Sequence, residues 1–106
     1  MTINTTYFCG NTELDLIIRN NINGDFSIVN NLSEIKPGAF INIDWDEKKL
    51  MLPLSLRRDF LSFSDKKWEW RYKFNKDGTL NIKDPKLYEL RNNGELKEYL
   101  CNTKNA

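Results

Sequence analysis

The stretch Trp68-Glu69-Trp70-Arg71-Tyr72-Lys73-Phe74 decides the fold class of this chain. Four aromatic residues alternate with three charged ones, and side chains along a β-strand point alternately to opposite faces. The pattern is typical of a strand with one buried face and one solvated face. We therefore expect a central strand whose core face is formed by Trp68, Trp70, Tyr72 and Phe74.

Alternation with a period of two recurs on both sides of this stretch. Ile41, Ile43 and Trp45 alternate with polar residues, and every second residue from 50 to 56 is leucine. Weaker versions predict strands near residues 14–18, 26–28 and 80–82. Pro53 lies inside the leucine strand and has no backbone N–H to donate, so it predicts a sheet edge or a bulge there.

Glycine-centred breaks separate these strands. Asn-Gly and Asp-Gly pairs supply the positive φ angles that two-residue hairpin turns require. Asp46-Glu47-Lys48 predicts a further tight turn. The breaks are Asn23-Gly24, Pro37-Gly38, Asp77-Gly78 and Asn93-Gly94.

Two segments depart from the simple strand pattern. Leu56, Phe60 and Phe63 are spaced like one face of a helix, and Ser55 can cap its first turn, which predicts one short helix over about 56–63. In residues 85–101, Asp84-Pro85 suits a helix start, whereas the Asn-Asn-Gly turn between two apolar segments suits a hairpin. We favour the hairpin and keep the helix as the alternative.

A chain of 106 residues predicts a single domain over 1–106. The expected fold is mainly β, with seven or eight short antiparallel strands and one short helix. Exposed strand edges promote aggregation, so a small antiparallel β-barrel is favoured over an open curled meander. If the barrel closes, Cys9 and Cys101 come from neighbouring first and last strands, although we expect two buried, reduced residues.

The two parts of the chain differ in charge. Residues 1–47 carry two basic and seven acidic side chains, a sum of −5, whereas residues 48–106 carry 14 basic and eight acidic ones, a sum of +6. Such an imbalance points to a charged partner, unless strands from the two parts interleave and neutralise each other. Basic and aromatic residues are densest over 57–76, which favours core packing of the aromatics, with base stacking or a ligand pocket as alternatives.

Recognisable catalytic arrangements are missing from the sequence. Without histidine the chain has no Ser–His or Cys–His pair, and it contains no P-loop, GxGxxG or CxxC motif. Asp44 and Asp46 would lie about 7 Å apart on one strand face, a spacing open to a carboxylate pair, a magnesium ion or a plain solvated face. We expect no enzyme activity, no cofactor and no metal.

These observations favour a non-catalytic accessory protein that binds an acidic face of a protein partner. The residues assigned to that contact are Arg57, Arg58, Lys66 and Lys67. The alternative is a small nucleic-acid-binding β-barrel, and a third possibility is a ligand carrier or enzyme whose open barrel mouth is lined by Trp45 and Trp70. The sequence shows neither a signal peptide nor an apolar run of membrane-spanning length, which predicts a cytoplasmic location and no membrane contact.

Overall fold

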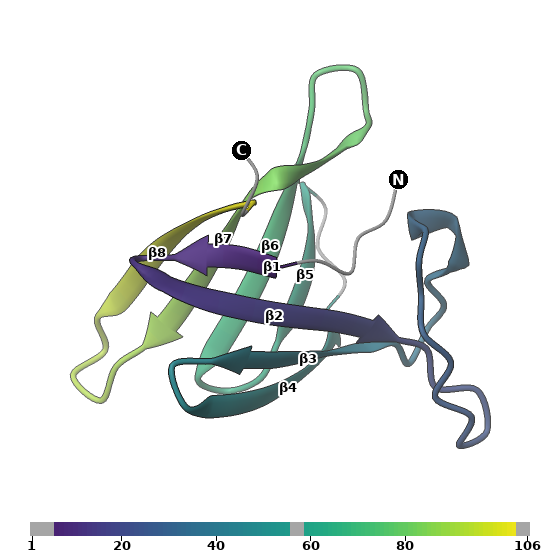
Figure 1. Cartoon of the computed structure of the whole chain (residues 1–106), viewed down its shortest axis with the longest axis horizontal. Helices are drawn as coiled ribbons and strands as arrows, with labels where there is room; N and C mark the ends of the chain where they lie inside the picture. The colour runs from purple at the N-terminus through teal and green to yellow at the C-terminus, as the bar shows by residue number, and fades with distance from the viewer. Residues whose placement is uncertain (1–5, 56–58, 104–106) are drawn as a thin grey trace.

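Across residues 6–55 and 59–103, which the computed structural model describes, the chain forms a closed barrel of eight antiparallel strands (Figure 1). Each strand pairs with the next one along the chain, and the first strand pairs with the last. The predicted small antiparallel barrel is therefore confirmed. The elements are β1 (Thr6–Cys9), β2 (Thr12–Arg19), the 3-10 helix η1 (Leu32–Glu34), β3 (Phe40–Trp45), β4 (Lys48–Ser55), β5 (Phe60–Ser64), β6 (Trp68–Phe74), β7 (Leu80–Leu90) and β8 (Leu96–Thr103).

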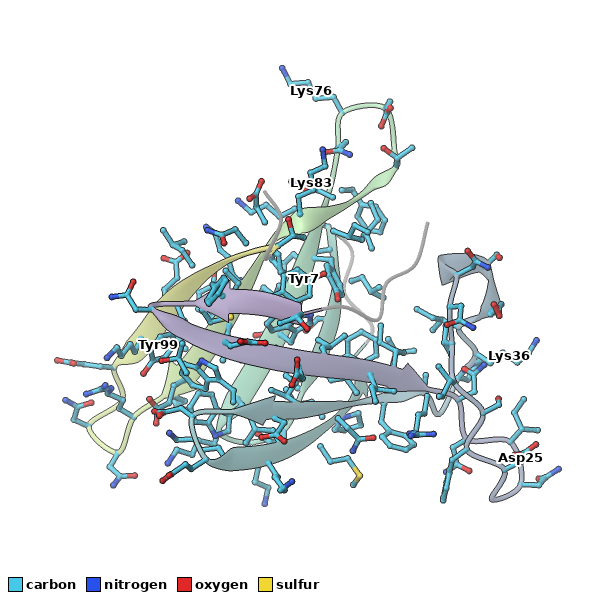
Figure 2. All side chains as sticks on the ribbon, in the orientation of Figure 1. Tyr7, Asp25, Lys36, Lys76, Lys83 and Tyr99 are labelled. Carbon is cyan, nitrogen blue, oxygen red and sulfur yellow. A yellow bond between two sulfur atoms is a disulfide. The ribbon has the colours of Figure 1, made fainter. Side chains whose placement is uncertain are left out.

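Strand β6 buries its aromatic face in the barrel, with one exception. Trp68, Trp70 and Tyr72 are buried, but Phe74 is 48% exposed. In the β6–β7 register, the single residue Tyr72 faces residues 82–85, which puts a bulge in β7. The outer part of the β6–β7 hairpin, with Lys76 and the bulge residue Lys83, projects away from the barrel (Figure 2), and Phe74 is exposed at its base.

The predicted helix over 56–63 is wrong where the structure describes it. Residues 60–63 belong to β5, in which Leu61 pairs with Tyr72 and Phe63 pairs with Trp70. The apolar residues of this segment fit both a helical and a strand period. Pairing with β6 gives Phe63 a fully buried position, so the strand prevails. Residues 56–58 lie outside the described residues.

The strand predicted near 26–28 is also absent, because residues 20–39 form a loop with two isolated bridges and the short helix η1. The buried side chain of Asn20 holds this loop. Its amide donates to Glu34 O at 2.7 Å, and its carbonyl oxygen accepts from Lys36 N at 2.9 Å. Residues 27 and 29 bond to the end of β2, through Asn20 N to Ser27 O at 2.9 Å and Val29 N to Ile18 O at 2.8 Å, but Phe26 and Ile28 stay about half exposed.

Two turn predictions are confirmed. Residues 85–101 lie in the β7–β8 hairpin, so the helical alternative is excluded for this segment. Asp46 and Glu47 join β3 to β4 with φ angles of 50° and 62°, both in the left-handed region. A two-residue turn of this kind matches the natural twist of the strands it joins.

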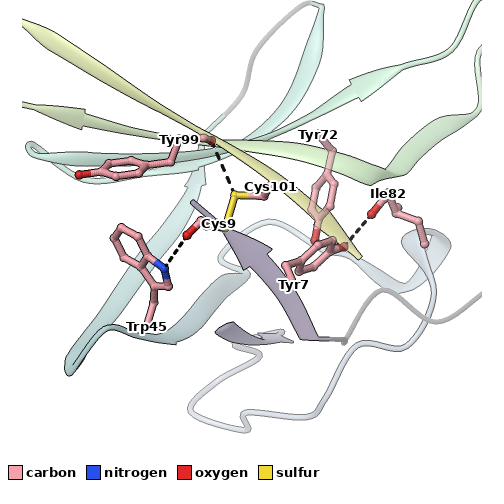
Figure 3. Close-up of a disulfide and its surroundings, with 7 residues drawn as sticks. All are labelled: Tyr7, Cys9, Trp45, Tyr72, Ile82, Tyr99 and Cys101. Carbon is pink, nitrogen blue, oxygen red and sulfur yellow. Dashed lines mark hydrogen bonds between the residues drawn. A yellow bond between two sulfur atoms is a disulfide. The ribbon is translucent and has the colours of Figure 1, made fainter. Parts of the chain in front are cut away.

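A disulfide closes the barrel between its first and last strands. Cys9 and Cys101 lie directly opposite each other in the β1–β8 register, and both are buried. Figure 3 shows the bond beside Trp45, whose indole N–H donates to Cys9 O at 3.4 Å. The expectation of two reduced cysteines is therefore wrong for the folded chain. Barrel closure brings the two residues into register despite their 92-residue separation.

Candidate partner-binding surface

Aromatic rings fill one end of the barrel. Trp45 is only 5% exposed, and its ring packs edge to face against Trp68 and Tyr99, with centroids 6.0 and 4.9 Å away. Lys48 Nζ lies 5.3 Å from the centroid of the Trp45 ring. Trp45 therefore belongs to a packed aromatic cluster and does not line an open mouth.

The middle of the barrel is filled as well. Trp70 is fully buried and packs edge to face against Tyr7 and Tyr72. The Tyr7 hydroxyl donates to Ile82 O at 2.8 Å and lies 3.5 Å from the Tyr72 hydroxyl (Figure 3). Burial raises the pKa of both tyrosines, that of Tyr72 well above its ordinary value. The expected pocket lined by Trp45 and Trp70 is thus replaced by packed rings, and the faces of these rings are unavailable for stacking on bases.

The carboxylates singled out in the sequence pair with lysines rather than with each other. Asp44 lies on β3, and Lys49 Nζ is 3.5 Å from its Oδ2. Asp46 lies in the following turn, where Lys48 Nζ is 3.4 Å from its Oδ2. Within residues 6–55 and 59–103, the His, Cys, Asp and Glu side chains form no group of three that could hold a metal ion.

The turn between β5 and β6 holds two of the four predicted binding residues, Lys66 and Lys67. Asp65 fixes the turn by accepting hydrogen bonds from the backbone N–H groups of Lys67, at 2.8 Å, and Trp68, at 2.7 Å. The turn is also tied to β7, because Leu90 N donates to Lys67 O at 2.8 Å. Both lysines are therefore displayed from an ordered turn, whereas Arg57 and Arg58 lie outside the described residues.

Beside this turn lies a surface feature that we call the lysine–leucine hollow, with a volume of about 160 Å³. Leu90 and Leu96 pair directly across the β7–β8 hairpin and are 46% and 57% exposed. These two leucines were not among the binding residues predicted from the sequence, although they flank the Asn-Asn-Gly turn as its nearest apolar residues. The hollow is lined by Ser64, Asp65, Lys66, Lys67, Trp68, Glu69, Tyr88, Leu90 and Leu96.

Acidic side chains around the hollow are already engaged. Glu89 is 4 Å or less from two cations, with Lys67 Nζ at 3.7 Å and Arg91 Nε at 3.8 Å from its carboxylate. Its side chain is only 16% exposed, whereas that of Lys67 is 58% exposed. Lys66 is exposed and makes no ion pair within the described part of the chain. Asp65 is exposed as well, so the exposed side chains of this turn, Asp65, Lys66 and Lys67, carry a net charge of +1.

A rigid stack borders the hollow. The Arg71 guanidinium lies 4.4 Å from the ring centroid of Phe60 and 4.3 Å from that of Tyr88. It also donates to Glu69 Oε1 at 2.9 Å, and this hydrogen bond is the main reason why the pKa of Arg71 is raised. Because Tyr88 also lines the hollow, the stack holds one wall of it in a fixed position.

Topology keeps the two charge regions apart. The strands follow each other around the barrel in chain order, so residues 1–47 supply β1 to β3 and residues 48–106 supply β4 to β8. Strands from the two regions meet only where β3 pairs with β4 and where β1 pairs with β8. Among the described residues the two sums are −5 and +3, since Arg57, Arg58 and Lys104 lie outside them, and these charges belong to segments that supply different sides of the barrel.

Comparisons with known proteins give one match. No curated protein and no solved structure matches the chain. In the described part of the structure, no helix is long and apolar enough to cross a membrane. The family model described as "Domain of unknown function (DUF8671)" matches residues 17–101, from within β2 to Cys101 in β8. Because this match covers most of the chain, the protein belongs to the DUF8671 family.

Proposed function

We propose that this protein is a non-catalytic accessory protein that binds a protein partner through the lysine–leucine hollow. The observation that carries the proposal is the pair of exposed leucines, Leu90 and Leu96, beside the exposed amines of Lys66 and Lys67. Apolar side chains next to exposed positive charge fit a partner surface with an apolar centre and acidic neighbours.

The local geometry supports recognition of a protein surface. The hollow has the size of one large side chain, and the hydrogen-bonded β5–β6 turn and the Arg71 stack fix its walls. A pre-formed surface of this kind loses little side-chain freedom on binding. The lysines contribute mainly by steering the partner, and salt weakens that steering because it screens charges beyond about 8–10 Å.

The test is capture of partners from a native lysate by four forms of the protein. These are the parent, Lys66→Glu/Lys67→Glu, Leu90→Ser/Leu96→Ser and a charge-matched control, Lys76→Glu/Lys83→Glu. The control residues lie on the projecting β6–β7 hairpin (Figure 2). All substituted side chains are exposed, so the melting temperature should change little.

We expect both hollow variants to lose the same captured protein, while the control retains it and nuclease treatment leaves capture unchanged. Equal capture by all four forms would place the interaction face elsewhere. Capture that disappears after nuclease treatment would favour the nucleic-acid alternative.

A further inference from the structure

Strands β2, β3 and β4 share an outward face with exposed apolar side chains at its centre (Figure 1). The registers of the three strands align the outward residues in three cross-strand rows. In the middle row, Ile17 is 37% exposed and Met51 is 62% exposed. Exposed apolar side chains that lie together are typical of interaction surfaces. We call this surface the β2–β4 face, and its rows are Asp15–Asp44–Lys49, Ile17–Asn42–Met51 and Arg19–Phe40–Pro53.

The two ends of the β2–β4 face differ in shape. Around the row of Asp15 lies a depression with a volume of about 370 Å³, lined by residues from all three strands. At the row of Arg19, the half-exposed ring of Phe26 packs edge to face against Phe40, with ring centroids 5.7 Å apart. One end of the face is therefore hollowed, whereas the other end carries an exposed aromatic ring from the loop over 20–39.

Opposite charges lie at equal distances on the two sides of Ile17. Asp15 and Arg19 point to the same side of β2, each two residues and about 6–7 Å from Ile17 along the strand. Asp15 accepts a hydrogen bond from Thr6 Oγ1 at 2.8 Å. The Arg19 guanidinium donates to Phe26 O at 3.2 Å. Within the described residues, neither side chain forms an ion pair.

The remaining charges of the face pair with each other. Lys49 Nζ lies 3.5 Å from Asp44 Oδ2. The three rows thus hold two acidic and two basic side chains, and their charges sum to zero. Glu13 lies on the same side of β2 but beyond Asp15, outside the three rows. A second copy placed on the three rows would therefore meet no net repulsion from them.

We propose that two copies of this chain pack their β2–β4 faces together about a two-fold axis that runs along the middle row. Such an axis places each residue opposite the residue that lies equally far on the other side of it. Asp15 of one copy then faces Arg19 of the second copy, and Arg19 faces Asp15 of the second copy. The exposed Phe26 ring of each copy lies over the depression of the other.

The charge pattern on β2 favours a second copy over an unrelated partner. An unrelated surface would need a basic, an apolar and an acidic group at the same spacing, whereas symmetry supplies all three from this chain. Among the described residues, 48–53 of β4 pair only with β3, so the other side of this segment is an open edge. The proposed contact uses the outward side chains and not that edge. It also uses none of the residues of the lysine–leucine hollow, so it does not rest on the proposed function.

Sedimentation equilibrium over a range of protein concentrations tests whether the dimer forms. Three short strands offer a small face, so we expect a dimer of twice the 12.5 kDa chain mass that forms at about 10–100 µM. Met51→Ser should weaken the dimer about tenfold, because it removes apolar area from the middle of the contact. Leu100→Ser is the matched control, since Leu100 is 66% exposed on β8, and it should leave the dimer unchanged.

Exchange of the two charges on β2 tests the two-fold arrangement. Asp15→Arg and Arg19→Asp should each weaken the dimer about tenfold, because each brings like charges together twice across the axis. The double variant Asp15→Arg/Arg19→Asp should restore the dimer, because opposite charges then face each other again. The melting temperature of each variant, measured at a concentration where it is monomeric, shows that the barrel is still folded.

Several results would overturn the proposal. A monomeric mass of the parent protein at about 1 mM would exclude the dimer. An unchanged dimer in Met51→Ser would place the contact on another face, and loss of the dimer in Lys66→Glu/Lys67→Glu alone would place it at the lysine–leucine hollow. Failure of the double charge exchange to restore the dimer would refute the two-fold arrangement. A mass that rises beyond the dimer with concentration would indicate a head-to-tail contact instead.

Discussion

The disulfide between Cys9 and Cys101 predicts a large loss of stability on reduction. It closes a loop across 92 residues, nearly the whole chain. The chain-entropy relation gives about 4.6 kcal/mol for a loop of that length, and measured losses for native disulfides are about 2–5 kcal/mol. Small domains are stable by only about 5–15 kcal/mol. Reduction should therefore remove a large share of the free energy of unfolding.

Urea unfolding of the oxidised and reduced parent protein measures this loss. We expect the reduced protein to unfold at a lower urea midpoint, and with a steeper dependence on urea because its unfolded chain exposes more surface. The variant Cys9→Ala/Cys101→Ala should resemble the reduced parent. Addition of reductant to that variant should change nothing, which makes it the matched control.

An equal urea midpoint for the oxidised form and for the reduced parent, with two free thiols shown by mass spectrometry, would refute this prediction. The same thiol measurement on protein trapped directly from cells tests the predicted cytoplasmic location. Disulfides rarely persist in the reducing cytoplasm, so a fully oxidised pair would argue for an oxidising compartment.

Two further predictions concern the aromatic core. Trp70→Ala should lower the free energy of unfolding by about 3–5 kcal/mol, since it empties a fully buried site, whereas Phe74→Ala on the projecting hairpin should cost far less; equal losses in urea unfolding would contradict the assigned core. Tyr7 and Tyr72 have folded pKa values raised above the ordinary 10.0, so the folded state holds its protons longer than the unfolded state. Their contribution to stability should be complete below pH 10 and decline as the pH rises further, which absorbance of tyrosinate during alkaline unfolding would follow; titration of both tyrosines in the folded protein at their ordinary pKa would refute it.

The strands were predictable wherever the apolar residues fitted the period of a strand and not that of a helix. Trp68 to Tyr72 alternate so strictly that no helix could bury their aromatic side chains on one face. The apolar residues of 56–63 fitted both a helix and a strand. Pairing with β6, in which Phe63 lies opposite Trp70, makes the described part of this segment a strand. Phe26 and Ile28 fitted a strand pattern, but Ile28 forms only a single bridge, with Arg19, which is too short a pairing to make a strand.

Part of the candidate site was also predictable from the sequence. Lys66 and Lys67 interrupt the strand pattern, and such interruptions mark surface turns, so their exposure followed from the sequence. Leu90 and Leu96 carry an ordinary strand pattern, and their exposure depends on which face of β7 and β8 the barrel buries. The disulfide likewise depends on barrel closure, which joins residues from opposite ends of the chain.

The two junctions of the barrel with the fewest residue pairs are stabilised in different ways. A fully closed barrel has no strand edges. In the described residues, β1 and β8 share only three residue pairs, and a disulfide seals that junction. Strands β4 and β5 share only two pairs, and no cross-link seals them; instead, Lys49 and Pro53 stand at the open edge. Lysine and proline prevent an unwanted identical strand from pairing, but they do not cover the backbone. The covalent bond therefore holds the β1–β8 junction, whereas the composition of β4, and not pairing along its length, protects the other junction from unwanted strands.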